Sequence, residues 1–329
     1  MRLLLLGGTK FLGRHMVDAA LEQGHEVVLF NRGRTNPNLY PQLERVTGDR
    51  DGALTALEGG RRFDGVIDTS GYVPRIVRQS AELLAKSCDF YAFISSISVY
   101  RDGIPPGFDE TAPTQNLEDQ ASENVEQDYG ALKAACERVV EAALPGRSLH
   151  VRAGLIVGPH DPTGRFTYWV GRIADGGDVL APAPADAPVQ VIDARDLAAW
   201  TVRMVAGGHP GVFNATGPAT TLTMEGLLDE CKRASGSNAR VIWADPGFLL
   251  QHEVEPWSEL PLWLPGEANA GFLQADISKA RAAGLGFRAL SQTVKDVLDW
   301  IADLRVFPGE AGLPRERELA LLDEWRAAS

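Results

Sequence analysis

Three residues of this sequence have the types and the spacing needed to move a proton and a hydride on one C–O group: Ser96, Tyr129 and Lys133. Tyr129 and Lys133 lie four residues apart, a spacing that places them on one face of a helix. Ser96 follows the apolar run Phe93-Ile94, where a buried strand reaches the edge at which open α/β sheets bind ligands. We interpret Tyr129 as the proton donor and acceptor and Ser96 as the group that orients the carbonyl oxygen.

The interpretation of Tyr129 depends on Lys133 as its neighbouring cation. A free tyrosine is a weak acid with a pKa of about 10. A lysine ammonium ~4 Å away, at an effective dielectric constant of about 20, favours the phenolate by roughly 4 kcal/mol. The positive charge of an oxidised nicotinamide acts in the same direction. We therefore expect these two charges to bring the pKa of Tyr129 into the range where acid–base catalysis at neutral pH is efficient. The alternative is that both residues lie on a helix surface and that Ser96 caps a strand end.

A glycine-rich turn near the N-terminus has the form of a phosphate-binding site. The apolar run Leu3–Leu6 is followed by Gly7-Gly8-Thr9-Lys10-Phe11-Leu12-Gly13 and then by residues with helical periodicity. Strand, glycine turn and helix start place backbone N–H groups where a dinucleotide pyrophosphate binds. A strict glycine pattern would have glycine at position 10, where Lys10 stands instead.

The basic residues beside this turn favour NADP over NAD. The second predicted strand is followed by Asn31-Arg32-Gly33-Arg34, without the carboxylate that would bind a free ribose 2′-hydroxyl. Lys10, Arg32 and Arg34 are able to surround a 2′-phosphate instead. The alternative for the arginines is that they are solvated side chains. Asp49, after the third predicted strand, is a candidate for the adenine amino group, with a solvated loop carboxylate as a nearly equal alternative.

Short apolar runs alternate with amphipathic stretches in the way a Rossmann-type doubly wound parallel sheet requires, so we predict an α/β fold. The predicted strands are Leu3–Leu6, Val27–Phe30, a short one ending near Val46, Gly65–Asp68, Tyr91–Ser95, Leu149–Leu155, Val189–Ile192 and Val212–Ala215. The first predicted helix follows Gly13. Further helices are predicted at Gly52–Leu57, Ile76–Lys86, Asp128–Ala143, Asp193–Val205 and Pro314–Trp325. Gly24 is expected to end the first helix in a left-handed conformation.

A shift in composition toward Pro, Gly and aromatic residues indicates a smaller, discontinuous C-terminal substrate domain. We assign residues 1–157 and 189–217 to the dinucleotide-binding domain. Residues 158–188 and 218–304 then form the substrate domain, and residues 305–329 a C-terminal helical tail. Residues 189–217 are expected to return to the sheet.

Candidate substrate residues lie in the first segment of that second domain. Arg165, Tyr168 and Trp169 combine an anion-binding group with stacking surfaces. Arg195, between two aspartates, is either a substrate residue or part of a structural salt bridge. Trp257 and Trp263, in a proline-rich stretch, belong either to a lid over the cleft or to an ordinary packed loop.

The turn, the run Ser95–Tyr100 and the segment Tyr129–Lys133 together resemble the extended short-chain dehydrogenase/reductase superfamily, the NAD-dependent epimerase/dehydratase group. The motifs Val151–Pro159, Val191–Asp196 and Phe213–Gly217 fall in that family's order, so the resemblance covers roughly residues 1–300. It implies that the catalytic residues are Ser96, Tyr129 and Lys133. It implies pyrophosphate contacts at Gly7, Thr9, Phe11, Leu12 and Gly13, ribose contacts at Thr69, Ser70 and Gly71, and nicotinamide contacts at Leu155 and Ile156.

Departures from the family pattern narrow the expected activity. Sugar-nucleotide dehydratases of the family carry Asp-Glu after the catalytic Ser or Thr, whereas this sequence has Ile97 and Ser98. Epimerases of the family usually have an acidic residue after the second strand, where Asn31-Arg32 stands. We therefore expect an NADP-preferring oxidoreductase that acts on a secondary alcohol or ketone. The alternatives are an NAD-dependent sugar-nucleotide epimerase and, because an atypical branch has a similar turn, an RNA-binding protein like the chloroplast stem-loop RNA-binding proteins.

Composition limits the partners. The 329 residues are 44% apolar with a formal net charge of -12, which is typical of a globular protein and disfavours a nucleic-acid surface. The three cysteines are far apart and no histidine pair has ligand spacing, so we expect no metal and a reduced cytoplasmic location. The expected partner is a small molecule, either a sugar nucleotide or an aromatic or alicyclic ketone, with no membrane. The resemblance leaves a homodimer open.

Overall fold

The computed structural model describes residues 1–304, 309 and 311–328. Its largest sheet has seven strands, all parallel, in the order β11-β6-β5-β4-β1-β2-β3. The strands are β1 (Arg2–Leu6), β2 (Glu26–Asn31), β3 (Glu44–Thr47), β4 (Phe63–Asp68), β5 (Cys88–Ser96), β6 (Ser148–Ala153) and β11 (Gly211–Ala215). The chain order reverses beside β1, so the predicted doubly wound parallel sheet is confirmed.

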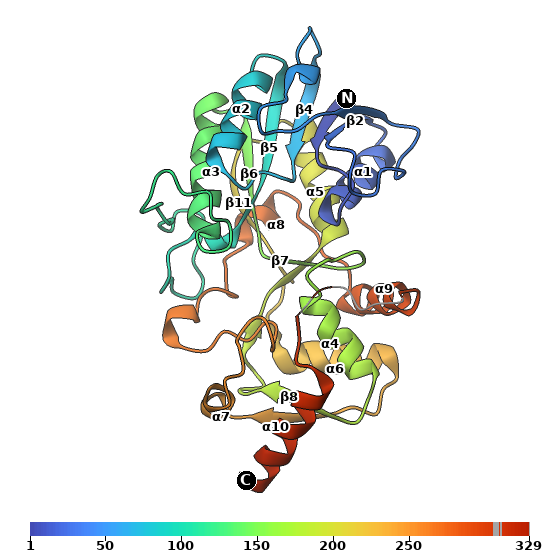
Figure 1. Ribbon diagram of the computed structural model, residues 1–329, viewed down its shortest axis with the longest axis vertical. Coiled ribbons are helices and arrows are strands. Elements are labelled where there is room, and N and C mark those ends of the chain that lie inside the picture. Colours follow the sequence, from blue (N-terminus) through green and yellow to red (C-terminus); the bar gives the residue numbers. More distant parts are fainter. Residues whose placement is uncertain (305–308, 310, 329) are drawn as a thin grey trace.

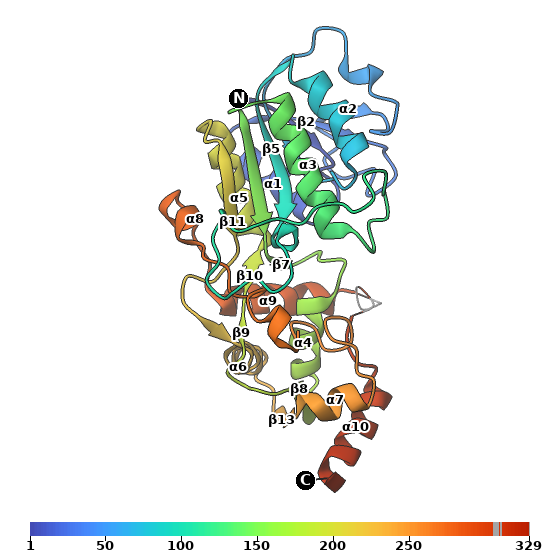
Figure 2. The same ribbon diagram turned by 90° about the vertical axis from the view of Figure 1, so that its left-hand side faces the viewer.

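Helices cover both faces of this sheet, which is why its central strands are apolar throughout (Figures 1 and 2). Leu3 and Leu5 face one hydrophobic cluster, while Leu4 and Leu6 face another. On one face lie α1 (Leu12–Glu22) and α5 (Ala194–Ala206), and on the other α2 (Pro74–Leu84) and α3 (Tyr129–Ala143). Gly24, after α1, has φ 76°, in agreement with the predicted left-handed helix end.

The chain leaves the sheet at Gly154, where an added Cβ would lie 2.2 Å from the Thr216 hydroxyl oxygen. The predicted strand Leu149–Leu155 is therefore divided into β6 and β7 (Leu155–Val157). The predicted return of Val189–Ile192 to the sheet is wrong. These residues form β9 (Pro188–Val189), paired with β12 (Leu222–Thr223), and β10 (Val191–Asp193), paired with β7. Among the later strands that the structure describes, only β11 rejoins the main sheet.

The remaining elements build a second body below the sheet, with a hydrophobic cluster of its own (Figure 1). They are α4 (Arg165–Ala174), β8 (Asp178–Pro182), α6 (Met224–Ser235), β13 (Arg240–Ala244), α7 (Pro246–Gln251), α9 (Leu290–Ala302) and α10 (Arg315–Ala328). Strands β8 and β13 pair with each other, and neither is among the strands that we predicted. Of the predicted tail 305–329, residues 305–308, 310 and 329 lie outside the described residues.

One segment of the assigned second domain packs back on the first. Helix α8 (Ser278–Ala282) contributes Ala280 to the cluster under α1 and α5. The indole of Trp200 in α5 donates to the Ala283 carbonyl at 3.1 Å. This segment is therefore anchored on the first body.

Short 3₁₀ turns lie between the regular elements. The predicted helix Gly52–Leu57 is a single 3₁₀ turn, η1 (Thr55–Leu57), while a second 3₁₀ turn, η2 (Ile97–Val99), follows β5 and a third, η3 (Glu267–Asn269), lies in the second body. In the described part of the chain, no helix combines the length and the apolarity needed to cross a bilayer.

Candidate active site

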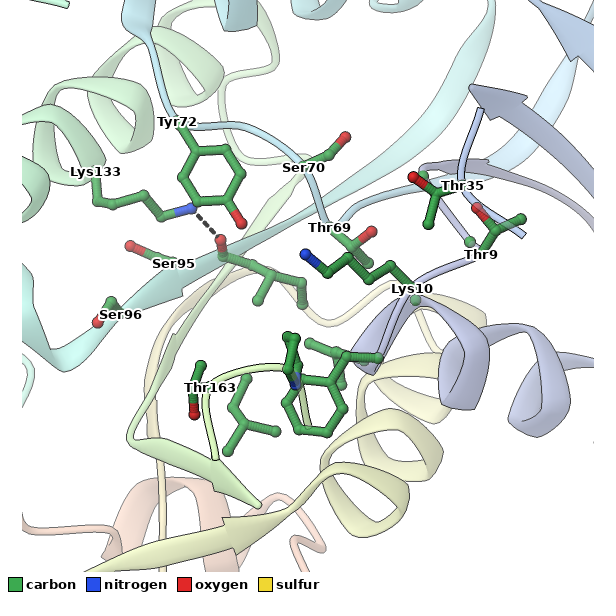
Figure 3. Close-up of a pocket in the computed structure, with 18 of the residues that line it drawn as sticks. Thr9, Lys10, Thr35, Thr69, Ser70, Tyr72, Ser95, Ser96, Lys133 and Thr163 are labelled. Carbon is green, nitrogen blue, oxygen red and sulfur yellow. Dashed lines mark hydrogen bonds between the residues drawn. The ribbon is translucent and has the colours of Figure 1, made fainter. Parts of the chain in front are cut away.

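A cavity of about 890 Å³ lies at the carboxyl ends of the parallel strands (Figure 3). It is lined by most of the residues singled out from the sequence. From the turn and the strand ends these are Gly7, Thr9, Lys10, Phe11, Leu12, Gly13, Arg32, Arg34, Asp49, Thr69, Ser70, Leu155 and Ile156. Ser96, Tyr129, Lys133 and Arg165 line the same cavity. The structure therefore brings the phosphate-binding motif and the proton-transfer motif into one space.

The glycine turn passes close to neighbouring backbone and side chains. Gly7 has φ 116°, and a Cβ there would lie 2.5 Å from the Thr69 hydroxyl oxygen. A Cβ at Gly13 would lie 2.8 Å from the Gly8 nitrogen. Phe11 precedes α1 and has no polar side chain to cap the helix. The turn therefore leaves room and backbone donors for an anionic group at the start of α1.

The loop after β2 is fastened to the glycine turn by two asparagines. The Asn31 amide donates to the Gly7 carbonyl at 3.0 Å, and the Asn36 amide donates to the Thr9 carbonyl at 2.7 Å. The Asn31 side-chain oxygen also accepts from the Gly33 N–H at 2.9 Å. Asn31 is thus occupied with the backbone, a role that the sequence did not indicate.

We call Lys10, Arg32 and Arg34 the basic rim of the cavity. All three side chains are exposed. None of them has a hydrogen-bond or ion-pair partner among the residues that the structure describes. In Figure 3 the Lys10 side chain extends from the turn into the cavity. The basic rim therefore offers three uncompensated positive charges beside the glycine turn.

A buried ion pair beneath the cavity was missed from the sequence. The Arg50 guanidinium binds both carboxylate oxygens of Asp68, at 2.7 and 2.8 Å, and the Tyr91 hydroxyl donates to Asp68 at 2.9 Å. Asp68 also accepts from the Ser70 N–H at 3.0 Å. The network holds the loop that carries Thr69 and Ser70. The neighbouring Asp49 faces the cavity and accepts from the Asp51 N–H at 3.1 Å.

Lys133 is buried and its ammonium is held by backbone carbonyls. It donates to Ile94 at 2.5 Å, the dashed line in Figure 3, and to Gly71 at 2.7 Å. Its Nζ also lies 4.2 Å from the centre of the Phe93 ring. Burial lowers the pKa of Lys133 to about 8. Gly71 therefore positions Lys133 and does not itself line the cavity.

Tyr129 is the first residue of α3, and the helix approaches η2 so closely that a Cβ at Gly130 would lie 2.0 Å from the Ser98 carbonyl oxygen. Burial, and then the nearby Tyr72, raise the pKa of Tyr129 to about 12, while the Ser96 hydroxyl and the Arg165 guanidinium oppose this rise. The expectation that Lys133 lowers the pKa of Tyr129 is wrong for the protein alone. The physical reason is desolvation of the phenol, together with an ammonium that donates to two carbonyls.

Ser96 ends β5 with its side chain at the cavity. Its hydroxyl donates to the Ser98 hydroxyl at 3.1 Å and accepts from the Ser98 N–H at 3.1 Å. Ser98 lines the cavity as well, although it was considered only as a departure from the dehydratase pattern. Two hydroxyl groups and the phenol thus share one end of the cavity.

We call the group Tyr72, Arg165, Trp257 and Phe272 the aromatic end of the cavity; all four residues line it. The Arg165 guanidinium carbon lies 5.5 Å from the centre of the Trp257 ring. The Trp257 and Phe272 rings meet nearly at right angles, with centroids 5.8 Å apart. Tyr72 and Phe272 were not singled out from the sequence, because neither lies in a motif with a characteristic spacing.

The other predicted substrate residues lie away from the cavity. Trp169 is fully buried in the core of the second body, where its indole donates to the Pro261 carbonyl at 2.8 Å. Tyr168 packs edge-on against it, with ring centroids 4.9 Å apart. Arg195 binds Asp193 at 2.7 Å and also Asp296, as in the salt-bridge alternative. None of these three lines the cavity.

Comparison with protein-family models identifies one family. The model described as "NAD dependent epimerase/dehydratase family" matches residues 3–216. Among curated proteins, the chloroplast stem-loop binding protein of 41 kDa b from Arabidopsis thaliana is 23% identical over 256 residues, 71% of this chain and 63% of that protein. A UDP-glucose 4-epimerase from Neisseria meningitidis serogroup B is 30% identical over 176 residues, 42% of this chain and 47% of the epimerase. The chain thus matches less than two thirds of either relative.

Solved structures share the fold over nearly the whole chain. The Bordetella bronchiseptica enzyme WbmH in complex with NAD+ has a TM-score of 0.69 at 19% identity, covering 93% of this chain and 99% of that one. Thermus thermophilus UDP-glucose 4-epimerase in complex with NAD has a TM-score of 0.66 at 18% identity, covering 92% and 99%. These similarities show the fold.

Proposed function

The chain belongs to the NAD-dependent epimerase/dehydratase family, and on that premise we propose that it is an oxidoreductase that interconverts a secondary alcohol and a ketone with a nicotinamide dinucleotide, NADP in preference to NAD. One observation carries this proposal: Ser96, Tyr129 and Lys133 line the same cavity as the glycine turn. A proton-transfer group and a dinucleotide site in one cavity are what such a reaction requires.

The residues present fit a dinucleotide. Side chains at Gly7 and Gly13 would collide with their neighbours, so the cradle at the start of α1 depends on glycine. We propose that Gly7, Gly13 and the intervening backbone bind the pyrophosphate. Thr69 and Ser70 then lie beside a ribose, and Leu155 and Ile156 beside the nicotinamide ring.

A bound nicotinamide dinucleotide supplies a hydride donor in the direction of ketone reduction and a hydride acceptor in the reverse direction. Tyr129 donates its phenolic proton to the carbonyl oxygen during reduction, and during oxidation it takes the hydroxyl proton as the phenolate, which forms once the phenol has released its proton to solvent. Ser96 orients that oxygen. Lys133 has three N–H donors, two of which are used by carbonyls, so one remains for a ribose hydroxyl.

The basic rim supports the preference for NADP. Lys10, Arg32 and Arg34 are exposed cations with no partner among the described residues. A ribose 2′-phosphate is an anion that such groups recognise, whereas a free 2′-hydroxyl is usually bound by a carboxylate. We propose that the basic rim surrounds the 2′-phosphate.

The test is a measurement of cofactor binding followed by net turnover. NADP+ and NAD+ are titrated into the purified protein by calorimetry, and a panel of secondary alcohols and ketones is then followed at the absorbance of reduced nicotinamide. We expect NADP+ to bind more tightly than NAD+ and at least one alcohol to be oxidised with net formation of NADPH. Failure of both cofactors to bind would contradict the proposal.

A sugar-nucleotide epimerase is the second candidate, supported by the match to the UDP-glucose 4-epimerase of Neisseria meningitidis. It would interconvert UDP-glucose and UDP-galactose without net change in cofactor oxidation state. The match to the stem-loop binding protein supports an RNA-binding role as the candidate of another class. That role would appear as RNA binding that weakens steeply as salt rises.

A further inference from the structure

The shape and charge of the aromatic end point to a substrate class. We propose that the substrate is a compact alcohol or ketone with one anionic group, a carboxylate or a monophosphate, bound by Arg165, and that the diphosphate of a nucleotide sugar does not fit there. This inference rests on the proposed oxidoreductase function. It assigns Arg165 as the residue that determines substrate specificity.

Arg165 has the features of a cation that lacks its anion. It is more than half buried at the start of α4, yet no described residue accepts a hydrogen bond from its guanidinium. Its Nε is buried without a partner. Burial lowers the pKa of Arg165, whereas the charges of Asp161 and Tyr129 oppose this shift. A desolvated guanidinium is normally matched by a carboxylate or phosphate, so a ligand anion completes the site.

Nearby structure holds Arg165 in place. The buried carboxylate of Asp161 accepts from the Thr163 N–H at 2.8 Å and from its hydroxyl at 3.0 Å, which shapes the turn into α4. The face of Trp257 then supports the guanidinium. Trp257 itself has φ 67° and donates its N–H to the Trp263 carbonyl at 3.1 Å. A strained residue held in this way at a cavity wall is consistent with a binding role.

The aromatic end is short. Beyond Tyr129 the cavity is lined by only a few residues of the second body, namely Pro162, Thr163, Arg165, Trp257 and Phe272. Behind Phe272 the chain is fastened to the loop after β5, because the Gly103 N–H donates to the Ala268 carbonyl at 3.0 Å and the Gly107 N–H to the Gln274 carbonyl at 2.7 Å. Behind α4 lies the packed core around Trp169.

The charges at this end favour a single anionic group. The other cations that line the cavity are either held by protein groups, as Arg50 and Lys133 are, or belong to the basic rim. In the second body, Arg172 and Arg288 are paired with Glu318 and Asp196. Among the described lining residues, Arg165 is therefore the free cation of the aromatic end. A nucleoside diphosphate would need further cations and space for its base.

Such a substrate also suits the geometry of the reaction. With its anion on Arg165 and its carbon skeleton against Tyr72, Trp257 and Phe272, its oxygen lies toward Ser96 and Tyr129, which share the cavity. Oxidation breaks the C–H bond of the carbinol carbon. The hydride would pass to the oxidised dinucleotide, whose positive charge favours ionisation of the Tyr129 phenol. The phenol would first release its own proton to solvent, and the resulting phenolate would take the hydroxyl proton of the substrate, so that a ketone remains.

The experiment compares four probes on the protein saturated with NADP+. Mandelate is a compact carboxylate with a secondary alcohol, and glycerol 3-phosphate is its phosphate counterpart. The third probe, 1-phenylethanol, has the mandelate skeleton without the anion, and UDP-glucose tests the nucleotide sugar. Binding is measured by calorimetry for the wild type, Arg165→Gln, Arg165→Lys and the exposed control Arg138→Gln.

We expect at least one compact anion to bind, with its affinity lowered at least tenfold in Arg165→Gln and partly retained in Arg165→Lys. The affinity for 1-phenylethanol and for NADP+ should change less than threefold, and Arg138→Gln should match the wild type. The inference is overturned if neither compact anion binds, if Arg165→Gln binds them normally, or if UDP-glucose binds more tightly than both. Because NADP+ binding is measured first, its absence would contradict the proposed function, whereas bound NADP+ with no bound compact anion would overturn only the substrate class.

Discussion

The basic rim and the aromatic end of the cavity both carry positive charge, but the two regions differ in how that charge is held. Lys10, Arg32 and Arg34 are exposed on loops, and no described residue pairs with them. At the aromatic end Arg165 is more than half buried against Trp257, and Lys133, which lines the same cavity, is buried between two carbonyls. Exposed charges are screened by salt and adjust to a ligand, whereas buried charges are strong and fixed. This difference fits our proposal that the basic rim selects the cofactor and that the buried groups around the aromatic end perform the chemistry.

The largest effect should come from Tyr129, which lines the cavity together with the aromatic end. Tyr129→Phe removes the proposed proton donor, so we expect turnover to fall about 10²–10⁴-fold with cofactor affinity nearly unchanged. The matched control is Tyr40→Phe, because the Tyr40 hydroxyl bonds Asp18 at 2.6 Å outside the cavity. Single-turnover rates and NADP+ titrations of both variants give the measurement. Full turnover in Tyr129→Phe would remove Tyr129 from the chemistry.

The second effect concerns the buried charge of Lys133. Its pKa is lowered from 10.5 to about 8 in the folded protein. Between these two pH values the unfolded chain binds more protons than the folded chain, so the stability of the folded state at this site rises with pH. From pH 7 to pH 10 the wild type should gain roughly 2–3 kcal/mol relative to Lys133→Met.

Urea unfolding at several pH values measures this gain. The exposed Lys86→Met is the control, and its difference from the wild type should stay constant. A constant difference for Lys133→Met as well would show that Lys133 keeps an ordinary pKa in the folded protein, and the contrast between the two regions would be lost.

A smaller effect is expected at the basic rim. The double substitution Arg32→Ala, Arg34→Ala should weaken NADP+ binding about tenfold, because charge-assisted hydrogen bonds to a phosphate contribute roughly 1.5–3 kcal/mol each before screening. Binding of NAD+ should change less than threefold, since it lacks the 2′-phosphate. Calorimetry on the variant and on Arg138→Ala separates the two cofactors. Equal losses for NADP+ and NAD+ would mean that the basic rim does not recognise the 2′-phosphate.

The smallest effect is expected from ionic strength, which should act on the exposed basic rim and not on the buried groups. Raising the ionic strength from about 0.05 to about 0.5 M shortens the range of electrostatic interactions to a few ångströms. NADP+ affinity should then fall a few-fold more than NAD+ affinity, while the rate of the chemical step at saturating cofactor should stay nearly constant. If the rate of the chemical step depends on ionic strength as strongly as cofactor affinity does, Tyr129 and Lys133 are not shielded from solvent.

Much of the fold was predictable because its signals are local. Leu3–Leu6 is apolar on both faces, as a central strand must be. Gly24 lies where the first helix ends in a left-handed conformation, which favours glycine for steric reasons. The errors fall where long-range pairing decides. Val189–Ile192 has the same apolar character as the sheet strands, yet its residues pair with β12 and β7 outside the sheet.

The candidate site divides in the same way. Gly7, Ser96 and Tyr129 were found because their spacing within a motif is characteristic. Tyr72 and Phe272 were missed because they come from separate segments and share the cavity only after folding. Trp169 has the same residue type as Trp257, but the first packs in the core and the second lines the cavity.

The sequence by itself determined most strands and helices of the parallel sheet, the glycine turn and the spacing of Tyr129 and Lys133, since these depend on neighbours a few residues away. Only the tertiary structure decided that the Lys133 ammonium meets the Gly71 and Ile94 carbonyls and that the Arg165 guanidinium has no hydrogen-bond acceptor among the described residues. The physical reason is that burial and electrostatic surroundings belong to segments far apart in the chain. Burial and electrostatic surroundings determine the direction in which a pKa is shifted, and the residue type alone does not.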